Sequence, residues 1–409
     1  MEKEYDIGIV GGGLAGASLA CCLADQPLRV AVFEEVPVNA TNQPSHDDRG
    51  LALSLSSHRV LNAINVWPAV TANAVPVKHI HISDRGKFGF VRLHATDAGL
   101  PALGYVVVAR ELGRALVEKM ASLDNVDYIC PAQVTDISPG PDNVEMGLKS
   151  GEQSRTVSCR LLVAADGSDS LIRDKLGIPA EVRDYGQTAI VSNISTTLDH
   201  ANTAYERFTR NGPLALLPLP DGRSVSIFTV VSSEKAAYLE MDDKEYLGVL
   251  EQTFGRRLGR FLAVGKRKAY PLRLVRSARQ HQERVVLVGN AAHTLHPNGA
   301  QGYNLGLRDV AGLAEVIIKA VQQQSDPGRE ASLEAYLNSR SDDQARTVRC
   351  TDNLADLFYN DDTFKAAGRN LGMLLLDTCL PLKIRFIQAA TGLYGRQPGL
   401  VRGLTPGQI

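Results

Sequence analysis

The stretch Gly11-Gly12-Gly13-Leu14-Ala15-Gly16 decides the fold predicted for this chain. It follows a short apolar strand over residues 6–10 and opens an apolar helical stretch over residues 14–24. A second strand over residues 29–33 ends at Glu34. This order of strand, glycine turn, helix and strand is typical of a dinucleotide-binding unit.

Each glycine of the turn has its own purpose in such a unit. Gly11 permits the tight turn, Gly13 lets the backbone approach a pyrophosphate, and Gly16 lets helix and strand pack closely. The helix N-terminus offers N–H groups and a positive dipole end to the phosphates. Glu34 lies 18 residues after Gly16, near the spacing of about 20 expected for a ribose-binding carboxylate. A glycine turn that only packs, followed by a surface carboxylate, is the structural alternative. The predicted site comprises Gly11, Gly13, Leu14, Ala15, Gly16 and Glu34.

Bulk composition favours a globular enzyme of two or three packed units. The chain has 409 residues, a net charge of −1 and 44% hydrophobic residues. This balance gives no indication of nucleic acid as a partner. Six cysteines occur without a C-x-x-C pair, which favours unbonded thiols in a reducing compartment and no metal site.

The uncharged run over residues 7–24 is long enough to imitate a membrane span. Its three consecutive glycines and the dinucleotide pattern argue against that interpretation. The first five residues lack the positive region of a signal peptide. We therefore expect a cytoplasmic protein without a transmembrane helix.

Hydrophobic patterning predicts a second sheet inserted into the first unit. Strands are expected within residues 77–95 and 187–233, a buried parallel strand over 285–288, and helices from Gly302 almost to the end. The predicted organisation is a discontinuous nucleotide-binding domain, a sheet domain and a C-terminal helical region. Their limits are residues 1–75, 103–180 and 275–330, then 76–102 and 181–274, then 331–409.

Two further motifs each follow an apolar strand, as the glycine turn does. The second is Asp166-Gly167, after the strand over residues 161–165. The third runs from Gly289 to His293 and continues from His296 to Asp309. Because doubly wound sheets bind ligands at the carboxyl ends of their strands, we expect the three motifs to converge.

These three motifs, in this order and spacing, resemble the flavin-dependent aromatic hydroxylases, which are single-component FAD monooxygenases. The resemblance covers nearly the whole chain. It narrows to the ubiquinone-biosynthesis hydroxylases through residues 81–86, 206–209, 212–215 and 290–309. It implies an α/β, p-hydroxybenzoate hydroxylase-like fold, in which a Rossmann-like FAD-binding domain carries an inserted antiparallel-sheet substrate domain and C-terminal helices.

The resemblance also assigns FAD contacts. It implies that Glu34 binds the adenosine ribose and that Asp166 and Gly167 contact FAD and the nicotinamide. Arg49 and Arg110 would approach the phosphate and ribityl chain, where a guanidinium fork pairs well with phosphate oxygens. Because Asp47 and Asp48 precede Arg49, a salt bridge is its alternative role, and Arg110 has a similar structural alternative. Asn290 stands where most of the family carries Asp, and an amide still hydrogen-bonds a ribityl hydroxyl.

A loop before the long helix is expected to position the flavin. Its N–H dipoles would stabilise the negative charge of reduced flavin. His293 and His296 have no third ligand nearby, so we expect them to pack or hydrogen-bond near the cofactor rather than bind metal. No histidine is singled out as a general base. The loop and helix start comprise Pro297, Gly299, Ala300, Gln301, Gly302, Tyr303 and Asn304.

The chain shows one dinucleotide unit, so NADH or NADPH would visit transiently. The resemblance implies that NAD(P)H reduces FAD, that O2 adds at flavin C4a, and that the hydroperoxide hydroxylates an electron-rich prenylated phenol. Three alternatives stay open: another ring hydroxylase of the same pathway (the 6-hydroxylase or the demethoxyubiquinol hydroxylase), a flavin-dependent prenyl reductase, and a non-catalytic FAD-holding scaffold.

A polyprenyl tail is nearly insoluble in water, so the substrate must come from a membrane or a partner protein. We expect peripheral contact with the inner face of the membrane and with other ubiquinone-biosynthesis proteins. The cationic and apolar tail around residues 383–387 is a candidate surface, with a helix packed on the body as the alternative. The apolar run over residues 214–219 either lines the pocket for the prenylated ring or is an ordinary core strand.

Overall fold

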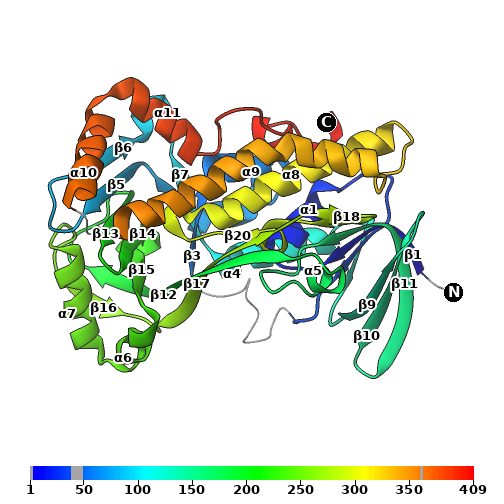
Figure 1. Cartoon of the computed structure of the whole chain (residues 1–409), viewed down its shortest axis with the longest axis horizontal. Coiled ribbons are helices and arrows are strands. Elements are labelled where there is room, and N and C mark those ends of the chain that lie inside the picture. The colour runs from blue at the N-terminus through cyan, green and yellow to red at the C-terminus, as the bar shows by residue number, and fades with distance from the viewer. Residues whose placement is uncertain (1–2, 38–48, 360–362) are drawn as a thin grey trace.

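The computed structural model describes residues 3–37, 49–359 and 363–409 (Figure 1). Its first sheet places five parallel strands in the order β19-β11-β1-β2-β8. Their apolar runs are buried, as expected of parallel strands covered on both faces. The antiparallel strands β18, β10 and β9 extend this sheet. The bounds are β1 Lys3–Val10, β2 Val30–Phe33, β8 Val126–Ile129, β9 Gln133–Pro139, β10 Val144–Ser150, β11 Gln153–Ala164, β18 His281–Gln282 and β19 Val285–Leu287.

Three helices form the main core on one face of this sheet. Helix α1 (Leu14–Cys22) packs against α4 (Ala109–Ala121) and α8 (Gln301–Gln322). The predicted strand, glycine turn, helix and strand over residues 6–33 are therefore confirmed, with the helix ending at Cys22.

The second sheet is the predicted insertion. Its strand order is β20-β17-β12-β15-β14-β13-β5-β6, with β16 paired to β12. The pairings are antiparallel, as predicted for the inserted sheet, except for β5 with β13, which run parallel. No hairpin joins these two distant segments, so chain connectivity does not impose an antiparallel direction. The bounds are β5 His79–Asp84, β6 Phe90–His94, β12 Ala180–Thr196, β13 Thr203–Thr209, β14 Gly212–Pro218, β15 Arg223–Val231, β16 Phe261–Val264, β17 Lys268–Ser277 and β20 His293–Thr294.

The two faces of the second sheet have different coverings. Helix α7 (Asp243–Phe254) covers one face and buries Leu214, Leu216 and Phe228. The other face is turned toward the first unit, where Val225 and Leu217 pack with Val106 of the small sheet β3-β7-β4. That sheet comprises β3 Gly50–Ser54, β7 Gly104–Val108 and β4 Val75–Val77.

Helix α9 (Glu330–Tyr359) joins the two units (Figure 1). Its 30 residues span about 45 Å at 1.5 Å per residue. It runs beside α8 and reaches β13 and β14, where Phe358 stacks on Phe208 at 3.6 Å between ring centroids. Helices α10 (Thr363–Thr378) and α11 (Leu380–Ala390) then cover β6 and its flank. Short helices include α2 Leu55–Ala63, α3 Trp67–Val70, α5 Leu171–Lys175 and α6 Lys235–Glu240.

The helices of the described ranges include none with the length and apolar character needed to cross a membrane. The limits assigned to the domains stay a prediction.

Candidate functional site

The three sequence motifs meet at the carboxyl ends of β1, β11 and β19. The Ala165 N–H donates to the Val10 carbonyl at 2.8 Å, which joins the first two strand ends. Thr294 Oγ1 donates to Ser168 Oγ at 2.9 Å, and Arg173 Nη1 donates to the Ala291 carbonyl at 3.3 Å. These contacts join the second and third motifs, so the predicted convergence is observed.

The glycine turn is closed too tightly for side chains at two positions. Gly11 has φ +99°, and a Cβ there would lie 2.5 Å from the Ala165 carbonyl oxygen. A Cβ at Gly16 would overlap the Gly11 carbonyl oxygen. Gly13 is the N-cap of α1, which starts with Leu14 and Ala15 and has neither a side-chain cap nor an acid in its first turn. The turn therefore leaves helix N–H groups available for an anionic ligand.

Glu34 lies directly over this turn. Its two carboxylate oxygens accept hydrogen bonds from the Gly12 N–H at 2.6 Å and the Val36 N–H at 2.8 Å. The residue is 9% exposed. The alternative of a surface carboxylate does not describe it, because the backbone fixes Glu34 beside the turn.

Arg49 and Arg110 are brought together by the backbone. The Ala109 N–H donates to the Arg49 carbonyl at 2.9 Å. The Arg49 guanidinium lies 5.5 Å from the ring centroid of Tyr270. Arg110 is exposed and lies 3.8 Å from a Glu111 carboxylate oxygen. Asp47 and Asp48, the alternative partners considered for Arg49, lie outside the described residues.

Asp166 has one satisfied carboxylate oxygen and one unsatisfied one. Oδ2 accepts from the Ile172 N–H at 3.1 Å, whereas the buried Oδ1 has no hydrogen-bond partner in the described structure. Burial raises the pKa of this carboxyl above its usual value. Gly167 follows with φ +89°, and Asn290 lies exposed at the end of β19. An orphaned buried acceptor beside a glycine cradle is the environment that a polyhydroxylated ligand would complete.

The loop before α8 has a left-handed backbone at two successive residues. After Pro297 and Asn298, Gly299 has φ +65° and Ala300 has φ +51°. Gln301 Nε2 donates to the Gly299 carbonyl at 3.1 Å and to the Ala390 carbonyl at 3.3 Å. A Cβ at Gly302 would meet no atom within 4 Å, so the start of α8 is open there.

Tyr303 and Asn304 anchor the start of α8 with their side chains. Tyr303 Oη lies 3.1 Å from Ser18 Oγ of α1. The Asn304 amide makes four hydrogen bonds, at 2.6–2.8 Å, that are all within the protein. These four bonds occupy both donor hydrogens and both acceptor positions of the amide. The predicted cofactor contact of Asn304 is therefore corrected for its side chain, which has no hydrogen-bonding position left. The Asn304 partners are the Ser54 N–H, the Ser57 hydroxyl, and the carbonyls of Ala52 and Ala300.

A buried charge network lies beneath the loop, and the sequence did not reveal it. His293 Nε2 lies 2.5 Å from Asp309 Oδ2, and Arg340 Nε lies 2.7 Å from Asp309 Oδ1. Asp343 pairs with both Arg340 and Arg308. His293 thus hydrogen-bonds near the site, as expected. In the sequence, the i, i+3 spacing of Arg340 and Asp343 on a helix could have indicated that these two residues pair.

The second sheet and the end of α9 bring polar groups up to the same loop. Tyr359 Oη lies 3.3 Å from His296 Nε2, and Gln187 Oε1 lies 3.4 Å from the same nitrogen. Burial lowers the pKa of His296 to about 4, so the ring is neutral at pH 7. Glu206 of β13 faces the Gly299 N–H, and burial raises its pKa to about 7 although that N–H acts in the opposite direction. Only the resemblance had pointed to the stretch containing Glu206, without a role.

The structure thus offers a fitting site for a flavin dinucleotide. A turn that a Cβ would fill, an open helix N-terminus, a fixed carboxylate at Glu34 and the orphaned Asp166 Oδ1 lie at adjoining strand ends. Within the described ranges, no cluster of three or more His, Cys, Asp or Glu could hold a metal ion.

Comparison with known proteins decides the family. Residues 4–351 match the FAD binding domain family. Ubiquinone hydroxylase UbiL of Rhodospirillum rubrum is 36% identical over 98% of this chain and 94% of its own length. The chain belongs to the FAD-dependent ubiquinone hydroxylases. FAD is its cofactor, and the protein is an FAD-dependent aromatic-ring monooxygenase of the ubiquinone-biosynthesis subgroup.

Two further comparisons bear on the hydroxylase. The 3-demethoxyubiquinol 3-hydroxylase of Escherichia coli is 30% identical over 96% of this chain and 100% of its own. The crystal structure of p-nitrophenol 4-monooxygenase PnpA from Pseudomonas putida matches with a TM-score of 0.80 at 18% identity, covering 97% of this chain and 100% of the other. The second similarity confirms the predicted fold class.

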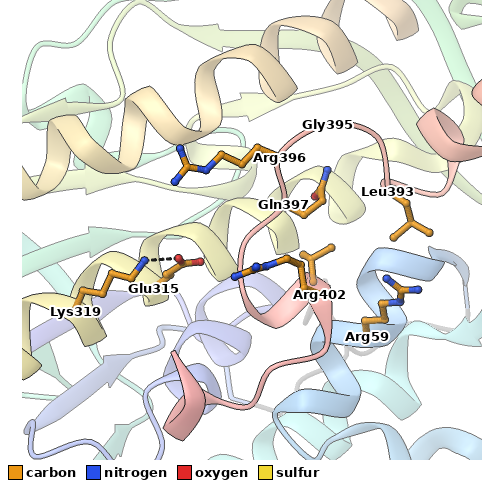
Figure 2. Close-up of a pocket in the computed structure, with 9 residues that line it drawn as sticks. Arg59, Glu315, Lys319, Leu393, Gly395, Arg396, Gln397 and Arg402 are labelled. Carbon is orange, nitrogen blue, oxygen red and sulfur yellow. Dashed lines mark hydrogen bonds and ion pairs between the residues drawn. The ribbon is translucent and has the colours of Figure 1, made fainter.

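A separate cavity of about 510 Å³ lies between α2, α8 and the C-terminal segment (Figure 2). Lys319 and Glu315 form an ion pair on one side, and Arg59 lies across the cavity from them. Glu315 is 14 residues along α8 from Gln301, or about 20 Å. This cavity is therefore distinct from the flavin site of the hydroxylase.

The tail around residues 383–387 packs on the body of the hydroxylase. Lys383 is 9% exposed and lies 3.7 Å from Asp377, and Ile387 is fully buried. The packed-helix alternative describes these two residues. Four leucines of α10 and α11 are instead 42–61% exposed, namely Leu371, Leu375, Leu380 and Leu382.

Proposed function

We propose that this hydroxylase converts 2-octaprenyl-6-methoxyphenol to the corresponding 1,4-benzoquinol in ubiquinone biosynthesis, using O2 and either NADH or NADPH. One observation supports an apolar phenol as substrate: a row of side chains across the second sheet is partly accessible although it lies in the middle of the sheet. We call it the open row. From β12 to β5 it comprises Val191, Ile227, Ala215, Glu206 and Ile82.

The open row follows from strand register. Val191 pairs with Ile227, Ile227 with Ala215, and Ala215 with Glu206, so these side chains share one face. Helix α7 buries the opposite face. Partial exposure on the face turned toward the flavin unit is the environment that an aromatic ring with an apolar tail would cover. The two roles considered for residues 214–219, core strand and pocket lining, therefore belong to opposite faces. Leu214 and Leu216 lie in the core, and Ala215 lies in the open row.

The chain's residues would orient the reactants. The glycine turn, Glu34 and Asp166 would hold the dinucleotide, and the loop at Gly299 and Ala300 would direct N–H groups at the flavin ring. Bound FAD supplies the reducing and oxygen-activating chemistry. The aliphatic members of the open row would keep water from the ring and hold it beside the loop.

A second candidate step is hydroxylation of a demethoxyubiquinol. It is favoured by the Escherichia coli relative of that name, which this chain matches over its full length. Both steps place a prenylated electron-rich ring on the same surface, so they differ in which ring carbon meets the flavin.

The deciding experiment reduces the purified protein anaerobically with NADH or NADPH and then admits air with each prenylated phenol. We expect the flavin to bleach and a hydroxylated product to form, with mass spectrometry and NMR locating the new oxygen. Product from the demethoxyubiquinol alone would select the second candidate. Substrate reduction without O2 would indicate a prenyl reductase, and a flavin that neither nicotinamide reduces would indicate a scaffold.

The exposed leucines of α10 and α11 are proposed as the membrane contact through which the insoluble tail is collected. An exposed apolar helix face adjoining the substrate sheet suits interfacial binding. Leu371→Glu with Leu375→Glu should lower sedimentation with anionic liposomes while FAD content stays normal. Unchanged sedimentation would contradict the proposal, and Leu198→Glu, at an exposed leucine outside α10 and α11, is the matched control.

A further inference from the structure

Glu206 is the one ionisable side chain in the open row. Its cross-strand neighbours are Ala215 on β14 and Ile82 on β5, which are both apolar. Its neighbours two positions away on β13, Ala204 and Phe208, share its face and are buried. An aliphatic residue would pack there at lower desolvation cost, so packing within the sheet does not explain an acid at this position.

No cation of the described chain neutralises this carboxyl. Arg207 is the next residue on β13, so it points to the opposite face, where Arg257 influences it. The polar groups near Glu206 are the Gly299 N–H of the loop and, on α9, Tyr359, on which the Glu206 charge acts. Behind Tyr359 lie His296, which is neutral at pH 7, and the Gln187 amide of β12. The carboxylate is thus held toward the flavin-positioning loop without a permanent ion-pair partner.

A phenol bound on this row needs a partner for its hydroxyl group. A buried O–H without an acceptor is destabilising, and the other members of the row offer only hydrocarbon. The Gly299 N–H can only donate, whereas a carboxylate accepts strongly. Removal of the phenolic proton also raises the electron density of the ring, which favours attack by an electrophilic oxygen.

We propose that Glu206 accepts the phenolic proton of the substrate and so both orients and activates the ring. This inference rests on the proposed function, because it takes a phenol as the ligand of the open row. The O–H bond of the phenol breaks and an O–H bond forms on a Glu206 carboxylate oxygen, while the electron pair stays on the phenolic oxygen. Glu206 releases the proton to solvent after the product leaves.

The test uses FAD-loaded full-length protein, with Glu206→Gln as the variant. Glutamine keeps a carbonyl oxygen facing the Gly299 N–H but cannot take the proton. The first readout needs no turnover: a short-chain prenylated methoxyphenol is added to oxidised protein and the ultraviolet difference spectrum of bound phenolate is recorded. We expect a phenolate band with wild type at a pH where the same phenol in water is still protonated, and its loss in Glu206→Gln. An equal band in both proteins, or none with wild type, would overturn the inference.

The second readout is hydroxylated product per NAD(P)H consumed. We expect kcat/KM for product to fall about 100-fold in Glu206→Gln, as for loss of a general base, with partial recovery in Glu206→Asp. Flavin content and nicotinamide-driven reduction should stay within about threefold. Glu145→Gln, at an exposed acid of β10, is the control. A wild-type phenolate band without any hydroxylated product would contradict the proposed function but leave the role of Glu206 standing.

Discussion

The two faces of the second sheet use the same strands for opposite purposes. Under α7, Leu214, Leu216 and Phe228 are almost completely buried. On the other face, Ala215 and Ile227 alternate with them and remain partly accessible. Because successive side chains of a strand point to opposite sides, one face can hold the fold while the other changes chemistry. Substitutions on the two faces should therefore affect different measurements.

The largest loss of stability is expected in the buried ion-pair network around Arg340. Arg340→Met leaves Asp309 and Asp343 without their shared partner beneath the loop. Breaking a buried ion pair on one side typically costs about 3–5 kcal/mol. We expect that loss in the free energy of unfolding, measured by urea denaturation at saturating FAD. Arg346→Met removes a more exposed partner of Asp343 and should cost less than about 1 kcal/mol; equal losses would show that burial does not set the difference.

The covered face should respond in stability alone. Leu216→Ala deletes a fully packed side chain under α7 and should lower the free energy of unfolding by about 2–5 kcal/mol. KM for the prenylated phenol should change less than threefold, as determined by steady-state kinetics at 15 °C. Leu216→Met nearly conserves volume and should cost less than about 1.5 kcal/mol. A large KM change in Leu216→Ala would contradict the division between faces.

The pH dependence of stability provides a third comparison, because His296 lies between the loop and the open face. Its pKa is lowered to about 4 from 6.5, so the unfolded chain binds the proton more readily. Stability is therefore present above pH 6.5 and is lost as pH falls toward about 4, by at most about 3 kcal/mol. Urea unfolding between pH 4 and 7 measures the slope. His296→Gln should make the slope shallower, with a remainder from His81, whose pKa burial also lowers to about 4; an unchanged slope would assign the proton uptake elsewhere.

The open face should respond mainly in substrate binding, with the smallest stability change. Ile227→Ala removes apolar contact from the row and should raise KM for the prenylated phenol about tenfold, since burying such a side chain is worth about 1.5–3 kcal/mol. The free energy of unfolding should fall by only about 1 kcal/mol, because Ile227 is partly accessible. A loss as large as that of Leu216→Ala would show that the row is core.

The sequence was sufficient for the parts of the site that depend on local backbone geometry. The glycine turn, Glu34 after β2 and Asp166 after β11 were predicted because strand ends and spacing determine their neighbours. The four hydrogen bonds of Asn304 and the network around Arg340 were not, because their partners lie far away in sequence on β3, α2 and α9. Glu206 could not be given a role for a similar reason: its surroundings depend on five strands aligning in register, which alternation within one strand does not reveal.

Helix α9 sets a mechanical condition on the whole enzyme. About a third of the way along α9, Arg340 pairs with Asp309, and at the end of the helix Phe358 stacks on Phe208 of the substrate sheet while Tyr359 lies beside His296. Phe358 lies 18 residues after Arg340, or about 27 Å along the helix, and a helix fixed at two points transmits displacement between them. Because α9 also contacts the loop at Asn298–Ala300, we expect displacement of the substrate sheet to be passed on to the loop that faces the flavin.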